Sequence, residues 1–220
     1  MKVAVCFSSG GTVNASFAVC AAALVAHSAA QGVQITIINA ESSLNMVNRN
    51  YAVRQASEAD CTHVLFLDSD MVFPADALMR LLQADKSIVG TLYARRVHPY
   101  ATLGYLLDKE STDDVREAGE MGLGCILIKL SVFDSLKAPY FRCPAVESTM
   151  LISDELRGFD LTGIHAGDTI DDSIWFSKAA RRAGFQLWVD VPLTLEVGHT
   201  GFSTHYVERR LAAVKETVHG

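Results

Sequence analysis

The sequence predicts an α/β protein with a mostly parallel central sheet and helices on both faces. Short apolar runs rich in β-branched residues alternate with longer segments of helical character. Such strands are joined by right-handed crossovers, which place helices on both sides of a parallel sheet. The chain has 220 residues, 50% of them hydrophobic and 20% charged, which is enough to bury one sizeable core. Because no repeat or linker interrupts it, we expect a single domain over residues 1–220.

The first half of the chain follows this alternation closely. We expect strands at Lys2–Phe7, Val33–Asn39, Val64–Leu67 and Ile88–Tyr93, and helices at Val13–Gln31, Leu44–Ala59 and Ala75–Ala84. Val33–Asn39 is β-branched, as a buried strand is, and Gly32 ends the helix before it. Leu78, Leu81 and Leu82 recur at helical spacing in the third helix.

The second half is less regular. We expect strands at Ala101–Leu107, Cys125–Leu130 and Phe185–Val189, a helix at Asp171–Ala183, a charged loop at Lys109–Glu117 and a long irregular segment at Arg142–His165. Long irregular segments are commonly functional. A final helix is predicted from one apolar stripe, formed by Val207, Leu211, Val214 and Val218.

The charge balance narrows the classes of partner. Net charge is -6, and nucleic-acid binding needs clustered Lys and Arg, so no nucleic-acid partner is expected, although a nucleotide is not excluded. The 5 Cys residues include no CxxC pair, which disfavours a zinc site or a disulfide framework. The polar Ser16, His27 and Ser28 argue against a membrane span in the Ala-rich stretch 15–30, and no signal peptide is evident. We therefore expect a cytoplasmic protein.

The stretch His63–Pro74, HVLFLDSDMVFP, places two carboxylates directly after a buried strand. Ligands of open α/β sheets bind at the carboxyl ends of the strands. A spacing of two would direct Asp68 and Asp70 to the same side of an extended chain. A hard divalent cation with oxygen ligands would neutralise both. The alternative is that one Asp caps the helix that follows, and this motif alone does not decide between the two.

Two more groups of candidate ligands follow later strands. Arg95 and Arg96 come directly after a strand, and arginines at such a place either bind phosphate or carboxylate or are simply solvated. Gly122 and Gly124 precede the apolar run at Cys125. They either let the backbone approach a ligand or mark a tight turn.

The last fifty residues add two acids and a histidine. Asp171 and Asp172 open a predicted helix, where acids suit the helix dipole but can also serve as a catalytic base. His199 follows a strand and is preceded by Gly198, with Gly201 shortly after it. A single histidine is more often structural than a ligand, yet one in this setting is able to complete a metal site.

Taken in order, these motifs resemble a GT-A glycosyltransferase of the bacterial and phage family-2-like type. The segments that carry the resemblance are FLDSDMVFP, IVGTLYARR, GLGCILIKLSVF, DDSIWFSKAARRAGFQLWVD and GHTG. They span most of the chain and are specific for the family rather than for a substrate. The resemblance implies a Rossmann-like GT-A fold, a nucleotide-diphosphate sugar as donor and Mn²⁺ or Mg²⁺ as cofactor. It also implies a nucleotide-binding half at 1–100 and an acceptor-binding half at 101–220.

The resemblance further implies roles for single residues. Asp68-Ser69-Asp70 matches the DxD motif, in which Asp70 would hold the metal directly and Asp68 would contact the donor ribose, or the metal through water. His199 would complete the metal coordination. A metal there would stabilise the leaving nucleotide as a Lewis acid. The remaining implied donor contacts are Ser8 at the first strand end, Arg49 on the second helix, Ser69, Arg95 and Gly124.

The resemblance also implies a general base, in one of two registers. The family pattern is a pair of acids, usually Glu-Asp, followed by two residues and then an aromatic residue, and the second acid takes the proton of the acceptor hydroxyl. If Trp175 is that aromatic residue, the pair is Asp171 and Asp172. If it is Phe176, the pair is Asp172 and Ser173, and the second acid is missing. We prefer the first register, with Asp172 as the base and Asp171 as the second candidate, and the resemblance then implies inversion of the anomeric centre.

Three rival interpretations are weighed against this one. A haloacid-dehalogenase-type phosphatase would use Asp68 as a nucleophile and Thr91 at a later strand end, but its motif normally follows the first strand. A non-catalytic nucleotide-sugar binding module would retain the shape without turnover. A nucleotidyltransferase would need a glycine-rich, basic loop after the first strand. Ser8–Thr12 has the glycines but no Lys or Arg. The acceptor of a glycosyltransferase, whether glycan, lipid-linked sugar, protein or small molecule, is not encoded in any motif.

Overall fold

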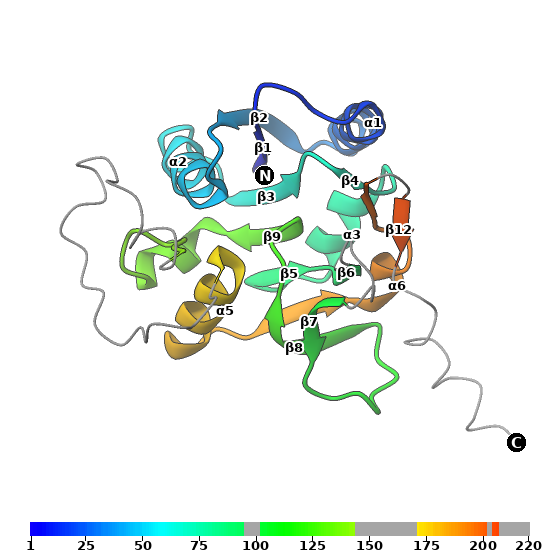
Figure 1. Cartoon of the computed structure of the whole chain (residues 1–220), viewed down its shortest axis with the longest axis vertical. Coiled ribbons are helices and arrows are strands. Elements are labelled where there is room, and N and C mark those ends of the chain that lie inside the picture. The colour runs from blue at the N-terminus through cyan, green and yellow to red at the C-terminus, as the bar shows by residue number, and fades with distance from the viewer. Residues whose placement is uncertain (95–101, 144–170, 202–203, 207–220) are drawn as a thin grey trace, which may run out of the picture.

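The computed structural model describes residues 1–94, 102–143, 171–201 and 204–206 (Figure 1). Its centre is a nine-stranded sheet in the order β2-β1-β3-β9-β5-β10-β8-β7-β6. The strands are β1 (Lys2–Ser9), β2 (Gln34–Glu41), β3 (His63–Asp68), β5 (Ile88–Gly90), β6 (Tyr93–Ala94), β7 (Thr102–Leu106), β8 (Val115–Met121), β9 (Cys125–Lys129) and β10 (Leu187–Asp190). Strands of the second half, β9 and β10, therefore lie on either side of β5 from the first half.

Most strands of this sheet point in one direction. β1 is parallel to both β2 and β3, and β5 is parallel to β10. β9 is antiparallel to its neighbours β3 and β5, and β8 is antiparallel to β10 and β7. β2, β1, β3, β5, β10 and β7 thus share one direction, opposed by β9, β8 and β6. The expected α/β class with a mostly parallel sheet is confirmed.

Helices cover both faces of the sheet. α2 (Asn45–Glu58) and α5 (Asp172–Arg182) lie on one side, and α1 (Ala15–Ala30) and α3 (Ala77–Gln83) lie on the other (Figure 1). Each side has its own cluster of buried apolar side chains, one including Phe66 and Phe176 and the other Phe17 and Leu65. Among the helices that the structure describes, none has both the length and the apolar character needed to cross a bilayer.

A second, three-stranded sheet completes one end of the fold. It has the order β12-β11-β4, with β4 at Met71–Val72, β11 at Gly198–Thr200 and β12 at Thr204–Tyr206. β4 follows β3 after a two-residue turn, and its Met71 is paired with His199 of β11. The chain between them contributes two short helices, η1 (Leu130–Ser135) and α6 (Val191–Thr194). The small sheet thus brings the C-terminal His199 beside the Asp70 turn.

The structure differs from the sequence prediction at β8, at β5 and at β2, which is an edge strand with mostly exposed or half-buried side chains rather than a buried strand. β8 begins inside the predicted charged loop Lys109–Glu117. Its Glu117 carboxylate pairs with the Arg181 guanidinium at 3.0 Å, and its buried Arg116 donates to the Asp113 carbonyl at 2.8 Å. The predicted strand Ile88–Tyr93 is divided into β5 and β6. The C-terminal apolar stripe, and nearly all of the Arg142–His165 segment, lie outside the described residues.

Candidate functional site

A polar pocket of about 360 Å³ lies at the carboxyl ends of β1, β2 and β3, with α5 and β11 closing its sides. This is the sheet edge at which α/β proteins bind ligands, and the volume suits a small molecule. The described lining residues are Ser8, Ser9, Gly10, Ser42, Ser43, Asn45, Arg49, Asp68, Ser69, Asp70, Tyr93, Leu103, Leu123, Asp171, Asp172, Ser173 and His199. Polar side chains dominate this lining, and they come from both ends of the sequence.

The two aspartates of the DxD motif face different partners. β3 ends at Asp68, and Ser69 and Asp70 form a turn, so the assumption of an extended chain through Asp70 is wrong. The turn is held by its backbone: the Ser69 carbonyl accepts a hydrogen bond from Asn14 N at 3.2 Å. Neither Asp caps a helix, because α3 begins only at Ala77. The capping alternative for this motif is therefore excluded.

Asp70 lies against His199. The distance from the Asp70 carboxylate Oδ2 to the His199 Nε2 is 3.3 Å. His199 Nδ1 lies 3.0 Å from the Ala94 carbonyl, and because a carbonyl only accepts, Nδ1 must carry the proton of that bond. In a neutral imidazole the Nε2 lone pair then faces Asp70 and the pocket. A fixed tautomer of this kind is typical of histidines that bind metals.

The side chains around Asp70 fit a metal site only if a bound substrate supplies further oxygen atoms. Within the described ranges, no group of three or more His, Cys, Asp and Glu side chains is arranged to hold a metal ion. Asp70 and His199 offer one oxygen ligand and one nitrogen ligand. Divalent cations that serve nucleotides are usually held by one or two side chains and by the phosphate oxygens of the substrate. The pair is compatible with a shared site of that kind.

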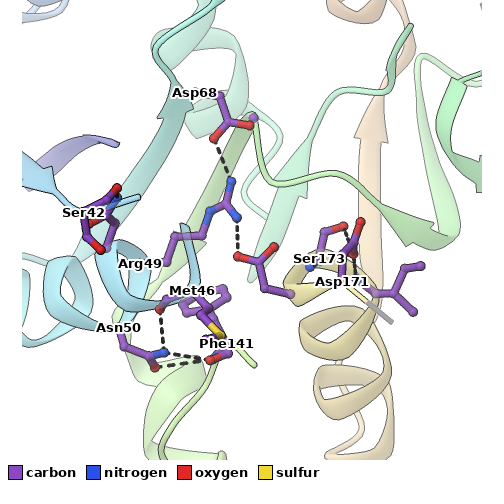
Figure 2. Close-up of polar contacts among 12 residues, drawn as sticks. Ser42, Met46, Arg49, Asn50, Asp68, Phe141, Asp171 and Ser173 are labelled. Carbon is purple, nitrogen blue, oxygen red and sulfur yellow. Dashed lines mark hydrogen bonds and ion pairs between the residues drawn. The ribbon is translucent and has the colours of Figure 1, made fainter. Parts of the chain in front are cut away.

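Arg49 of α2 occupies the space between two carboxylates. One terminal nitrogen of its guanidinium lies 2.7 Å from Asp68 Oδ1 (Figure 2). The other is paired with Asp172 Oδ2. The side chain is only 4% exposed. Burial by itself would lower the pKa of Arg49, but the charges of Asp68 and Asp172 outweigh burial and raise that pKa. Arg49 therefore remains a cation throughout.

Asp171 and Asp172 have separate roles at the start of α5. Asp171 is the N-cap, and its carboxylate accepts hydrogen bonds from the backbone N–H groups of Ser173 (3.0 Å) and Ile174 (2.9 Å). Asp172 is the first helical residue and points to Arg49. Burial raises the pKa of the Asp172 carboxyl above its usual range, and the Arg49 charge offsets this only in part. A buried carboxylate with a raised pKa is a better proton acceptor near neutral pH.

Two glycines make room for Tyr93 beneath Asp68. The Tyr93 hydroxyl accepts a hydrogen bond from Gly124 N at 3.0 Å, and its ring meets the His199 ring edge-on at 5.4 Å. A Cβ on Gly124 would lie 2.8 Å from that hydroxyl and 3.0 Å from Asp68 Oδ2, and one on Gly122 would overlap the same hydroxyl. Burial raises the pKa of the Tyr93 phenol, which therefore stays protonated.

Most of the residues proposed from the sequence meet in this pocket: Ser8, Arg49, Asp68, Ser69, Asp70, Asp171, Asp172 and His199. Gly124 lies next to them, but the space at its Cα is filled by Tyr93 and Asp68. Arg95 lies outside the described residues. The pocket also includes Ser42, Ser43 and Asn45, which the sequence analysis missed. Their position directly after the second strand is the signal that identifies them, since the carboxyl ends of parallel strands share one edge.

The phosphatase alternative lacks one of its residues at this site. Thr91, which that mechanism would need beside the nucleophile, is fully buried and is not among the lining residues described. Asp68 also follows the third strand of the chain rather than the first. The position of Thr91 therefore disfavours attack by Asp68 on a phosphate.

Comparison with known proteins supports the fold and leaves the function open. No family model and no curated protein matches the sequence. Among solved structures, A197 from STIV matches with a TM-score of 0.57 at 16% identity, over 91% of this chain and 86% of that one. This likeness shows a shared fold alone.

Two further solved structures match more weakly. One is a glycosyltransferase involved in the glycosylation of the major capsid of PBCV-1, with a TM-score of 0.34 at 12% identity, over 63% of this chain and 68% of that one. The other is a mannose-1-phosphate geranyltransferase from Thermus thermophilus, with a TM-score of 0.41 at 11% identity, over 60% of each chain. These partial likenesses decide neither fold nor function.

Proposed function

We propose that this protein is a metal-dependent glycosyltransferase that moves a sugar from a nucleotide-diphosphate donor to an acceptor hydroxyl. The observation that carries the proposal is the convergence of three groups on one pocket at the sheet edge. These groups are the Asp70–His199 pair, the Asp68 carboxylate and the largely buried Asp172 carboxylate. The resemblance of the sequence to GT-A glycosyltransferases agrees with these positions.

The charge of the pocket supports a requirement for a cation. Its described lining contains four aspartates and a single arginine, whose charge is already shared between Asp68 and Asp172. A diphosphate would be repelled by such a lining, whereas a divalent cation held at Asp70 and His199 would attract it. Mn²⁺ or Mg²⁺ bound there would act as a Lewis acid toward the departing diphosphate.

The protein's own residues would then carry the proton transfer. Asp172 accepts the proton of the acceptor hydroxyl while the hydroxyl oxygen forms a bond to the anomeric carbon. The bond between that carbon and the donor diphosphate breaks, and its electron pair leaves with the diphosphate. Attack from the side opposite the leaving group inverts the anomeric centre. The hydroxyl and amide side chains of Ser8, Ser43 and Asn45 line the same pocket and are available to the nucleoside.

The test is thermal stability against UDP, GDP, CDP, ADP and dTDP, each with Mn²⁺, with Mg²⁺ and with EDTA. A ligand specific for the folded state raises stability by about 2.7 kcal/mol at a hundredfold excess over its dissociation constant. We expect a metal-dependent shift with one base. The matching nucleotide sugars are then assayed for release of the nucleoside diphosphate. No shift with any nucleotide would overturn the proposal, and binding without release would identify a binding module instead.

A further inference from the structure

Arg49 joins the two sides of the pocket through a single side chain. Its guanidinium is paired with Asp68 at the end of β3 and with Asp172 at the start of α5. We infer that Arg49 is a positioning residue, which holds these two carboxylates in place and does not itself bind the donor diphosphate. The inference rests on the proposed function and departs from the donor contact that family resemblance implies for Arg49.

The contacts of the guanidinium leave it little capacity for a phosphate. Both terminal nitrogens are engaged by carboxylates, and the side chain is 4% exposed, against 24% for Asp68 and 13% for Asp172. Turning toward a diphosphate would leave the Asp172 carboxylate buried without its counter-charge, which is strongly unfavourable. Asp68 and Asp172 are thus more exposed to the pocket than the arginine that they hold.

The helix that bears Arg49 is itself fixed against α5. Asn50, the next residue, donates to the Phe141 carbonyl at 2.8 Å and accepts from Tyr140 N at 2.8 Å. Phe141 in turn stacks on Phe176 of α5, with ring centroids 5.0 Å apart. Figure 2 shows Arg49 directed toward Asp68 and Asn50 directed toward Phe141. Neighbouring residues of α2 therefore fix it to β3 and α5 at once, which suits a rigid support.

This arrangement predicts a separation of binding from turnover. Without the Arg49 guanidinium, the Asp68 and Asp172 carboxylates repel each other, and Asp172 loses its fixed orientation toward the acceptor. A lysine is a compact point charge that lacks the fork needed to bridge two carboxylates. Because the cation site at Asp70 and His199 does not involve Arg49, metal-dependent nucleotide binding should survive the substitution.

The experiment compares Arg49→Lys and Arg49→Met with Arg54→Met, an exposed arginine of the same helix. The probes are Mn²⁺ with the nucleoside diphosphate that stabilises the wild type most, and the matching nucleotide sugar. We expect the rate of diphosphate release to fall by about 10²-fold in both Arg49 variants, as misplaced catalytic groups do. The dissociation constant of the nucleotide should stay within about threefold, and Arg54→Met should match the wild type. A dissociation constant that rises in step with the loss of rate, or an unchanged rate, would overturn the inference.

A second measurement separates failure of the inference from failure of the proposed function. If the wild type neither binds nor turns over any donor, the proposed function has failed. The pairing is then tested by unfolding Arg49→Lys, Asp172→Asn and the double variant. We expect the unfolding equilibrium constant of the double variant to differ by about tenfold from the value that the two single effects predict together. Additive effects would show that Arg49 does not hold Asp172.

Discussion

Asp70 and His199 lie 3.3 Å apart, Oδ2 to Nε2, although they come from opposite halves of the sequence. The contact is supported by the backbone beside it. Thr200 donates to the Asp70 carbonyl both from its backbone N, at 2.7 Å, and from its hydroxyl, at 2.6 Å. The pairing of β11 with β4 is thus what brings a histidine to the DxD turn.

Asp70→Asn and His199→Gln should each abolish metal-dependent nucleotide binding. Asp70→Asn removes the negative charge that attracts the cation, and His199→Gln removes the imidazole nitrogen, while both roughly keep the size of the side chain. Calorimetric titration of the nucleoside diphosphate in Mn²⁺ and in EDTA measures the effect. His27→Gln, on α1 and away from the pocket, is the matched control and should bind normally. If Asp70→Asn still binds the nucleotide fully, Asp70 is not a metal ligand.

Asp172→Asn should lower turnover by about 10² or more while leaving nucleotide binding intact. The amide cannot accept the proton of the acceptor hydroxyl. Asp171→Asn is the matched control, because asparagine is as good an N-cap as aspartate, and its turnover should stay close to that of the wild type. Equal losses in the two variants would contradict the assignment of Asp172 as the base.

The pH dependence of turnover should show the raised pKa of Asp172. The base works only when deprotonated, and burial raises its pKa in the folded protein. An ordinary aspartate ionises near about pH 4. The rate should therefore rise with pH in a range above that value. Diphosphate release measured from pH 4 to 8 tests this. The residual activity of Asp172→Asn should not show this rise with pH. If the rise persists in that variant, it reports the ionisation of another group.

Gly122→Ala and Gly124→Ala should destabilise the protein by about 1–3 kcal/mol each, as overpacked sites do. An added Cβ at either position would press on the Tyr93 hydroxyl, and at Gly124 also on Asp68. Urea unfolding of each variant measures the loss. Gly10→Ala is the control, since its added Cβ meets no atom within 4 Å. If all three variants unfold alike, the contact with Tyr93 is not a tight one.

The sequence was most informative about single strands and helices, because the same periodicity that shapes these elements is visible in the sequence. Buried strands and amphipathic helices have fixed periods, so the alternation that places α1, α2 and α3 between β1, β2, β3 and β5 was predictable. The same logic placed Asp68 at a strand end and Asp171 at a helix start. It failed at β8, where Glu117 is paired with Arg181, a residue distant in sequence that no local pattern connects with it.

By itself the sequence determined the α/β class, the edge of the sheet at which the candidate site lies and the chemical types of the groups gathered there. Only the tertiary structure decided which groups meet. It set Asp70 against His199, made Asp171 the N-cap of α5 while Asp172 pairs with Arg49, and placed Arg49 between two carboxylates. Periodicity reports the faces of single elements, whereas these contacts depend on strand pairing and helix packing between distant segments, which no local pattern encodes.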